Sequence, residues 1–328
     1  AAIHAHPAGD RIYARLTEAR ALAEAQAAEA RARAGLRLSP LDGVPVSWKD
    51  LFDSAGTATE SGSRLLEGRV PAQDADVLRN ATAAGLICLG KTHMTELAFS
   101  GLGLNPMTST PPNVNDPALV PGGSSSGAAT SVAFGLAPAA IGSDTGGSVR
   151  IPAAWNDVIG LKTTHGRLPM AGTVPLVESF DTIGPLTRTV EDAALILAAL
   201  GGTKPADLRG ASLKGCRFMI LETVALDQCR EGPMKGFDQA VARLKDAGAE
   251  IVRDTIPELA EAMSLSAIVF TSEAYAIWRD KIEAAPEKMY GPVRERFRSG
   301  AGFNAADYVA GWRKVKAVRQ VWNERTAG

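Results

Sequence analysis

Two glycine–serine loops lie close together near the middle of the chain, Pro121-Gly-Gly-Ser-Ser-Ser-Gly127 and Gly142-Ser-Asp-Thr-Gly-Gly-Ser148. The second loop follows the short apolar run Leu136–Ile141, which predicts a buried strand. Upstream, Val44-Pro-Val-Ser-Trp-Lys49-Asp50 places a lysine at the end of another apolar run. The sequence therefore predicts that three polar side chains able to form a proton relay lie at the edges of strands: Lys49, Ser124 and Ser148.

Around these loops the sequence alternates between helix and strand patterns. Ala72–Ala84 predicts a helix with Asp74 and Asp76 in its first turn, and Leu86–Gly90 predicts the strand that follows. Gly127–Phe134 is small and apolar, which suits a helix packed closely on a sheet. This alternation is typical of α/β folds.

Further helices and strands are predicted on either side of the two loops. Residues 8–35 predict one alanine-rich amphipathic helix, and Thr189–Leu200 a helix whose first turn Thr189 caps together with Asp192. After Gly202 the composition shifts. The patterns there predict strands over Cys216–Leu221 and Glu250–Arg253, and helices over Met234–Ala247, 256–284 and 305–325.

Composition narrows the class of protein. The chain has 328 residues, a hydrophobic content of 45% and a net charge of −1. Such a balance gives no long-range attraction to nucleic acid or to an anionic membrane, and no apolar run approaches the roughly 20 residues that cross a bilayer. Cys88, Cys216 and Cys229 lack the spacing of metal ligands. We therefore expect a cytoplasmic protein that binds neither nucleic acid directly nor a membrane.

The second glycine–serine loop has three interpretations from its residues alone. Its glycines allow successive backbone N–H groups to converge on one point, as they do around a phosphate or the oxyanion of an acyl-transfer intermediate. The phosphate interpretation is disfavoured, because neither a Gly-Lys-Ser/Thr ending nor G-x-G-x-x-G is present. Ser148, the last residue of the loop, favours the oxyanion interpretation. An ordinary glycine turn stays open as well.

A serine nucleophile needs a base within hydrogen-bond reach. Lys49 can serve only if it is neutral, which requires burial or nearby positive charge to lower its pKa by several units. A solvated lysine paired with Asp50 is the alternative. Because no G-x-S-x-G motif accompanies the histidines, a Ser-His-Asp triad is disfavoured.

The motifs and their order resemble the amidase signature family. The resemblance rests on both loops, the second continuing through Val149-Arg-Ile-Pro-Ala-Ala154, and covers about residues 40–200. The other matching motifs are Gly43-Val-Pro, Lys49-Asp50, Gly90-Lys-Thr92, Gly160-Leu-Lys162, Gly166-Arg167 and Phe180-Asp-Thr-Ile-Gly-Pro185.

This resemblance implies a Ser–cis-Ser–Lys triad. In it Ser148 is the nucleophile, Ser124 the bridging serine on a cis Gly123–Ser124 bond, and Lys49 the base. An acyl-enzyme forms and water releases it, with no metal or cofactor. The resemblance also implies an oxyanion hole made by the backbone N–H groups of Thr145, Gly146, Gly147 and Ser148. The implied supporting residues are Ser125, Asp144 and Arg150.

The implied fold is a single α/β/α domain over residues 1–328, with a central mixed β-sheet covered by helices. The portion over residues 203–328 is expected to shape the substrate side. Ser126, Trp155-Asn-Asp157 and Thr163-Thr-His165 depart from the usual family residues without touching the triad. Family members typically continue for a hundred or more residues, so we expect the carboxyl-terminal part of the fold to be missing from this chain.

Three functions are compatible with these observations. The favoured one is a free-standing amidase that cleaves a carboxylic amide to the acid and ammonia or an amine. Met94–Leu102 and Met170–Val177 are its expected substrate walls, and their composition favours an apolar or aromatic amide. The second is the A subunit of a glutamine-dependent aminoacyl-tRNA amidotransferase, and the third is a non-catalytic anion- or nucleotide-binding protein. The expected partner is a small-molecule amide, and a homodimer is left open.

Overall fold

The computed structural model describes residues 1–327, which form two compact units. The first unit contains Ala1–Ala206 and Ile277–Phe297, and the second contains Asp207–Ala276 and the residues from Arg298 onward. The sequence predicts a single domain over residues 1–328. The division into two compact units does not test whether they fold as one domain, so this stays a prediction.

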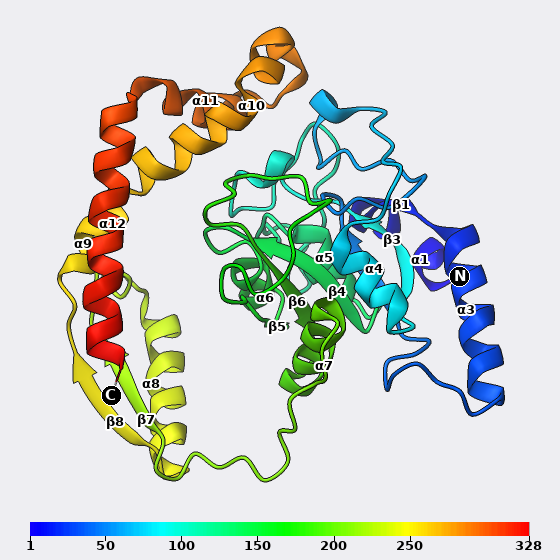
Figure 1. Ribbon diagram of the computed structural model, residues 1–328, viewed down its shortest axis with the longest axis horizontal. Helices are drawn as coiled ribbons and strands as arrows, with labels where there is room; N and C mark the ends of the chain where they lie inside the picture. Colours follow the sequence, from blue (N-terminus) through cyan, green and yellow to red (C-terminus); the bar gives the residue numbers. More distant parts are fainter. Residues whose placement is uncertain (328) are drawn as a thin grey trace. The chain divides into compact units, whose positions relative to one another are not determined.

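A six-stranded mixed sheet forms the centre of the first unit (Figure 1). Its strand order is β1-β3-β2-β4-β6-β5. Strand β2 pairs in parallel with both β3 and β4, and the remaining pairs are antiparallel. The sheet and its covering helices confirm the α/β fold class with a central mixed β-sheet. The strands are β1 Tyr13–Leu16, β2 Pro45–Lys49, β3 Ile87–Thr92, β4 Ala139–Asp144, β5 Ile159–Gly160 and β6 Thr182–Thr187.

Helices of the first unit pack on this sheet. Helix α5 contacts β2 and β4, and its small buried residues Ala128, Ala129 and Val132 join Ala140 and Leu186 of the sheet in one apolar core. Small side chains allow the helix backbone to approach the sheet closely, as the sequence predicts. The helices are α1 Ala2–Ala5, α2 Gly9–Ile12, α3 Glu18–Arg33, α4 Asp76–Ala83, α5 Ser126–Ala133, α6 Arg150–Trp155, α7 Val190–Gly201 and α11 Gly291–Arg298, with 3-10 turns η1 Arg64–Leu66, η2 Glu96–Ala98 and η4 Pro286–Lys288.

The single helix predicted over residues 8–35 is wrong in its first half. Helix α2 ends at Ile12, strand β1 follows, and α3 begins only at Glu18. Tyr13 is buried, pairs with Thr92 of β3, and its hydroxyl lies 2.7 Å from the Ser47 hydroxyl. Pairing with β3 and burial of Tyr13 outweigh the local helix propensity of the alanine-rich pattern.

Helix α7 begins as predicted. The Thr189 hydroxyl accepts a hydrogen bond from the Asp192 N–H at 3.0 Å, which satisfies one of the free donors of the first turn. The helix ends at Gly201, and the next residue, Gly202, has a φ of 61°, the left-handed conformation common after helices.

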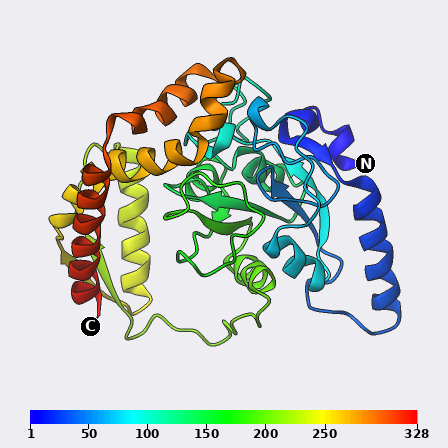
Figure 2. The same ribbon diagram turned by 45° about the horizontal axis from the view of Figure 1, so that its top comes forward.

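The second unit is built on a β–α–β element. Strands β7 Arg217–Leu221 and β8 Glu250–Asp254 pair in parallel and are joined by α8 Glu231–Asp246. These elements confirm the strands and the helix predicted there. Helix α12, Ala305–Thr326, packs against α9 and η3 (Figures 1 and 2). The intervening elements are α9 Glu258–Ser264, the π-helical turn η3 Ala267–Thr271, α10 Ser272–Ala284, which continues into the first unit, and the 3-10 turn η5 Ser299–Gly302.

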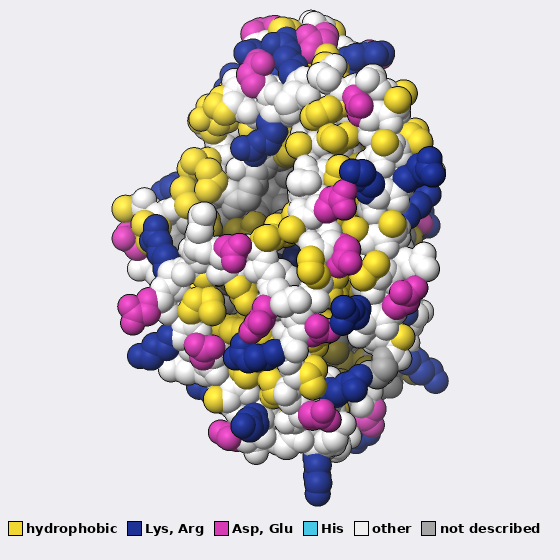
Figure 3. Space-filling view, turned by 90° about the vertical axis from the view of Figure 1, so that its left-hand side faces the viewer, with side chains coloured by type: hydrophobic (Ala, Val, Ile, Leu, Met, Phe, Trp, Pro, Cys, Tyr) yellow, Lys and Arg dark blue, Asp and Glu magenta, His cyan; other side chains and the backbone are white. Residues whose placement is uncertain are grey.

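The surface of the second unit mixes apolar and charged side chains. Figure 3 shows hydrophobic groups between lysines, arginines and carboxylates on one face. Met263 of α9 and Val309 and Trp322 of α12 are among the exposed apolar residues. Among residues 1–327, the helices include none that is long and apolar enough to span a membrane.

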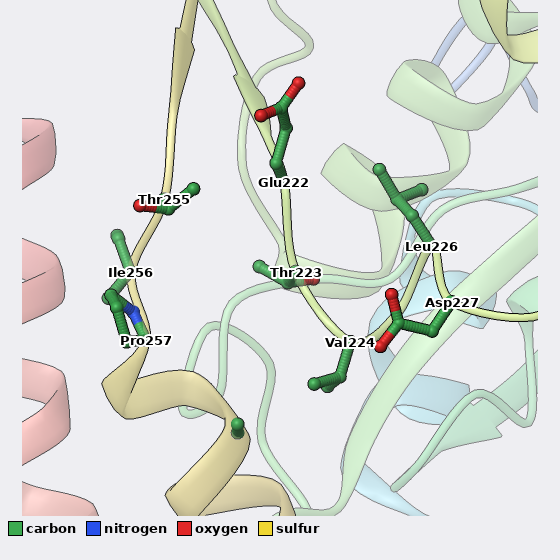
Figure 4. A pocket seen from close by; sticks show the side chains of 9 residues that line it. Glu222, Thr223, Val224, Leu226, Asp227, Thr255, Ile256 and Pro257 are labelled. Atoms are coloured by element: carbon green, nitrogen blue, oxygen red, sulfur yellow. The ribbon is translucent and has the colours of Figure 1, made fainter.

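A surface pocket of about 450 Å³ lies where β7 and β8 end. Figure 4 shows the residues after β7 facing those after β8 across it. None of the predicted site residues lines this pocket. Its lining residues are Glu222, Thr223, Val224, Leu226, Asp227, Thr255, Ile256, Pro257 and Ala260.

Candidate active site

Lys49 is the last residue of β2 and is fully buried. Its Nζ lies 2.7 Å from the Ser124 Oγ and 2.8 Å from the Ser143 Oγ. Burial lowers the pKa of Lys49 from 10.5 to about 7, although the charges of Asp144 and Asp181 act in the opposite direction. An amine with this pKa is substantially neutral near pH 7, as a general base must be.

The sheet explains why Lys49 meets these serines. Strands β2 and β4 are parallel neighbours, with Trp48 opposite Ile141. The carboxyl ends of parallel strands meet at the same edge of a sheet, which is the usual place for sites in α/β folds. Lys49 at the end of β2 therefore reaches Ser143 near the end of β4.

Ser124 lies in the first glycine–serine loop, directly before α5. It is fully buried, and the Gly123–Ser124 peptide bond is cis. A Cβ atom on Gly123 would lie 2.7 Å from the Gly103 nitrogen, so only glycine fits before the serine. The Ser124 carbonyl accepts a hydrogen bond from the Thr95 N–H at 3.1 Å, which holds the loop against the segment after β3.

Ser125 joins the two glycine–serine loops. Its N–H donates to the Ser148 carbonyl at 3.2 Å, and its hydroxyl donates to the Ser143 carbonyl at 3.2 Å. Ser148 is 7% exposed, so its side chain lies just below the surface. The structure thus brings the loops of Ser124 and Ser148 together, with Lys49 in contact with Ser124.

Asp144 organises the second loop. Its carboxylate accepts the Gly147 N–H at 2.7 Å and the Val149 N–H at 3.1 Å. Arg150 binds the same carboxylate through Nε at 3.0 Å and Nη2 at 2.9 Å. Burial raises the pKa of Asp144, but the hydrogen bonds from Arg150 and the backbone outweigh it and hold the pKa below its usual value.

Other N–H groups of this loop lack a partner within the part of the chain that the structure describes. Within residues 1–327, those of Thr145, Gly146 and Ser148 have no hydrogen-bond partner, whereas that of Gly147 is taken by Asp144. A Cβ on Gly146 would meet nothing within 4 Å, so the loop faces open space there. The loop can therefore receive a negatively charged oxygen through its free N–H groups, and the oxyanion role of all four residues stays a prediction.

Sequence reasoning missed two residues of this site. The Ser143 Oγ accepts a hydrogen bond from the Lys49 Nζ, and the buried Asp181 accepts a hydrogen bond from the Thr145 hydroxyl at 2.5 Å. Both lie within the matching motifs, so the signal was present. Their roles depend on the pairing of β2, β4 and β6, which the motifs alone do not specify.

Histidine, cysteine, aspartate and glutamate are the side chains that commonly bind metal ions. Within residues 1–327, no group of three or more His, Cys, Asp or Glu side chains is arranged to hold a metal ion. The three cysteines are free, Cys88 buried and Cys216 and Cys229 exposed.

Comparison with known proteins gives consistent matches. The profile of the family described as Amidase matches residues 5–327. A curated relative, the glutamyl-tRNA(Gln) amidotransferase A subunit of Acidothermus cellulolyticus, is 38% identical over 267 residues, covering 77% of this chain and 53% of the relative. A crystal structure of an amidase superposes with a TM-score of 0.87 and 32% identity, over 95% of this chain and 71% of that one.

A second similar structure is that of a peptide amidase. The peptide amidase of Stenotrophomonas maltophilia has a TM-score of 0.78 and 29% identity, over 92% of this chain and 70% of that one. The chain spans about half the length of the curated relative, 53%, so nearly half of that relative has no counterpart among the matched residues.

Proposed function

Because the chain belongs to the amidase family, we propose that it hydrolyses a carboxamide through Ser148, Ser124 and Lys49. The observation that carries the proposal is the buried Lys49 Nζ, 2.7 Å from the Ser124 Oγ with its pKa lowered to about 7. A neutral amine has two N–H groups and one lone pair. The two Ser143 oxygens, at 2.8 and 3.5 Å, accept the N–H groups and leave the lone pair for the Ser124 hydroxyl.

The proposed reaction proceeds through an acyl-enzyme. Lys49 accepts the Ser124 proton while Ser124 accepts the Ser148 proton, and the Ser148 Oγ attacks the amide carbon. The free loop N–H groups stabilise the oxyanion. As the carbon–nitrogen bond breaks, the relay returns a proton to the leaving nitrogen. Water then attacks the ester by the same proton path and releases the acid.

The curated relative favours glutamine as the amide. That protein is named as the A subunit of a glutamyl-tRNA(Gln) amidotransferase. On this basis the chain releases ammonia from glutamine and passes it to a partner that acts on charged tRNA. The sequence alone favours a free-standing amidase. The name of this relative favours the amidotransferase A subunit instead.

A free-standing amidase is the second candidate. The solved relatives described as an amidase and a peptide amidase favour it. Both candidates use the same triad and differ only in the acyl group and in the need for a partner. The non-catalytic anion-binding alternative predicts an unreactive Ser148.

The test measures ammonia or amine release from glutamine and from a panel of simple, aryl and peptide amides. We expect Ser148→Ala to abolish release and Lys49→Ala to lower it by roughly 10²–10⁴-fold, the range for a general base. Near-normal rates for Lys49→Ala at pH 7 would contradict the base assignment. Glutamine turnover that rises with the partner proteins of a tRNA amidotransferase supports the first candidate, and turnover of the panel without them supports the second.

Labelling by a fluorophosphonate tests the nucleophile independently of the substrate. We expect covalent labelling of the chain at Ser148 and none in Ser148→Ala. An unlabelled wild-type chain that also hydrolyses no amide would support the non-catalytic alternative.

A further inference from the structure

Asp181 lies beside the predicted oxyanion loop because of strand register. Asp144 at the end of β4 pairs with Thr182 at the start of β6 in the antiparallel ladder. The next residues outward are therefore Thr145 and Asp181, which meet just beyond the sheet. This is the sheet edge at which Lys49 contacts Ser143.

The Asp181 carboxylate connects two segments that are distant in sequence from each other. One oxygen accepts the Thr145 hydroxyl at 2.5 Å. The other accepts the N–H groups of Leu176 at 2.9 Å and Val177 at 3.1 Å. Leu176 and Val177 end the segment that the sequence predicts as a substrate wall, so one buried side chain touches both the loop and the wall.

We propose that Asp181 is a positioning residue that fixes the oxyanion loop against the 176–177 segment and supplies a buried negative charge beside Lys49. The proposal rests on the proposed amide hydrolysis, and it assigns a role to a residue that neither binds the substrate nor transfers a proton in that reaction.

The surroundings of the Asp181 carboxylate differ from those of the Asp144 carboxylate. Asp144 is paired with Arg150, whereas Asp181 has no cation within 4.0 Å in the part of the chain that the structure describes. Lys49 is the charged group that acts on Asp181, and Asp144 acts on the same lysine. Burial raises the pKa of Asp181 above its usual value, although its hydrogen bonds and Lys49 act in the opposite direction, and the charge of Asp181 raises the pKa of Lys49. Removing the charge therefore lowers the pKa of Lys49.

Three variants separate the charge from the hydrogen bond. Asp181→Asn removes the charge and keeps the shape, Thr145→Val removes the hydroxyl and keeps the backbone N–H, and Thr145→Ser restores a hydroxyl. We expect kcat/KM to fall roughly 10- to 100-fold in Asp181→Asn, mainly through kcat, which is the usual loss for a hydrogen bond to a charged group. The acid limb of its pH–rate profile moves to lower pH. We expect Thr145→Val to lose kcat and Thr145→Ser to stay within a few-fold of wild type.

Two results would overturn the proposal. One is an Asp181→Asn variant with wild-type kcat/KM and an unmoved acid limb, and the other is a Thr145→Ser variant as slow as Thr145→Val. A purely structural role lowers the rate without moving the acid limb, so the pH profile distinguishes the two roles. Thermal unfolding of each variant establishes that the comparison is between folded proteins.

A readout without substrate keeps this test separate from that of the proposed function. The ε-carbon signal of ¹³C-labelled lysine reports the titration of Lys49, assigned by its loss in Lys49→Met. We expect a midpoint at about 7 in the wild type and a lower one in Asp181→Asn. Unchanged midpoints would overturn the proposal even in an active enzyme. A lowered midpoint in a chain that hydrolyses no amide would support the proposed role of Asp181 and contradict the proposed amide hydrolysis.

Discussion

At the scale of the residue, burial of one amine determines what the site can do. Lys49 has no exposed surface, and its polar neighbours are serine oxygens rather than a paired carboxylate. A lysine in such a place is costly when charged, so it is either neutral or destabilising. The resemblance assigns the base role to Lys49, but the sequence alone leaves a solvated lysine open. Burial rules out the solvated lysine and leaves the base role as a prediction, and burial comes from strands that are remote in sequence.

The depressed pKa predicts that Lys49 destabilises the fold in acid. The folded pKa of about 7 lies below the ordinary value of 10.5, so the unfolded chain binds the extra proton between these limits. The penalty is complete below pH 7 and disappears as the pH rises to 10.5. We expect Lys49→Met to raise the free energy of unfolding by roughly 2–5 kcal/mol at pH 6 relative to its effect near pH 10. Urea unfolding across this pH range measures it.

Lys204 is exposed and supplies the matched control. We expect Lys204→Met to show the same small effect on the free energy of unfolding at every pH. If the Lys49→Met difference were equally independent of pH, the lysine would titrate alike in the folded and unfolded chains, and the neutral-base assignment would be wrong.

At the scale of the element, the loop after β4 holds its shape through Gly147. Its φ is 132°, a conformation rare for other residues, and its N–H donates to the Asp144 carboxylate. A Cβ there would also approach the Ile151 Cδ1 to 2.7 Å. The free N–H groups on either side of Gly147 keep their direction only while this conformation persists.

We therefore expect Gly147→Ala to lower kcat by roughly 10- to 1,000-fold, up to the loss of one oxyanion donor. The matched control is Gly166→Ala, because Gly166 has a φ of 77° with nothing within 4 Å of its would-be Cβ. The control also has a positive φ but lies outside the loop. Steady-state kinetics and thermal unfolding of both variants measure the effect. Equal kcat values for the two variants would show that the Gly147 conformation is irrelevant to catalysis.

Elements were predictable where their signals are local. Thr189 caps α7 through a bond to a residue three positions away, and the pattern contains both partners. Strand β1 was missed because its partner is β3, which lies far along the chain, and its own sequence resembles the helices on either side. The same reason hides Ser143, whose partner Lys49 lies on β2, and Asp181, whose partner Thr145 directly follows β4.

At the scale of the whole molecule, the chain leaves the first unit after Ala206 and returns to it over Ile277–Phe297. The helical pattern over residues 256–284 is correct, but periodicity does not indicate on which unit a helix packs. Helix α10 begins in the second unit and ends in the first, where the Trp278 Nε1–H donates to the Pro175 carbonyl at 3.0 Å. Pro175 directly precedes the segment that Asp181 holds.

The returning segment is anchored at its far end by Phe297. This side chain is fully buried, and its ring meets that of Phe99 edge-to-face at 4.8 Å. Arg296 strengthens the contact by donating from Nη1 to the Phe99 carbonyl at 2.9 Å. The segment therefore belongs to the apolar core of the first unit rather than lying loosely on its surface.

Because Phe297 is buried, we expect Phe297→Ala to lower the free energy of unfolding by roughly 3–5 kcal/mol, the range for deleting a core phenylalanine. Phe237 of α8 is 37% exposed, so Phe237→Ala removes the same atoms at a small cost and serves as the matched control. Chemical denaturation followed by tryptophan fluorescence, with Trp278 in the returning segment, measures both. Similar losses for the two variants would show that the segment contributes no core to the first unit. A large loss for Phe297→Ala alone would mean that residues 277–297 and the amino-terminal part unfold together.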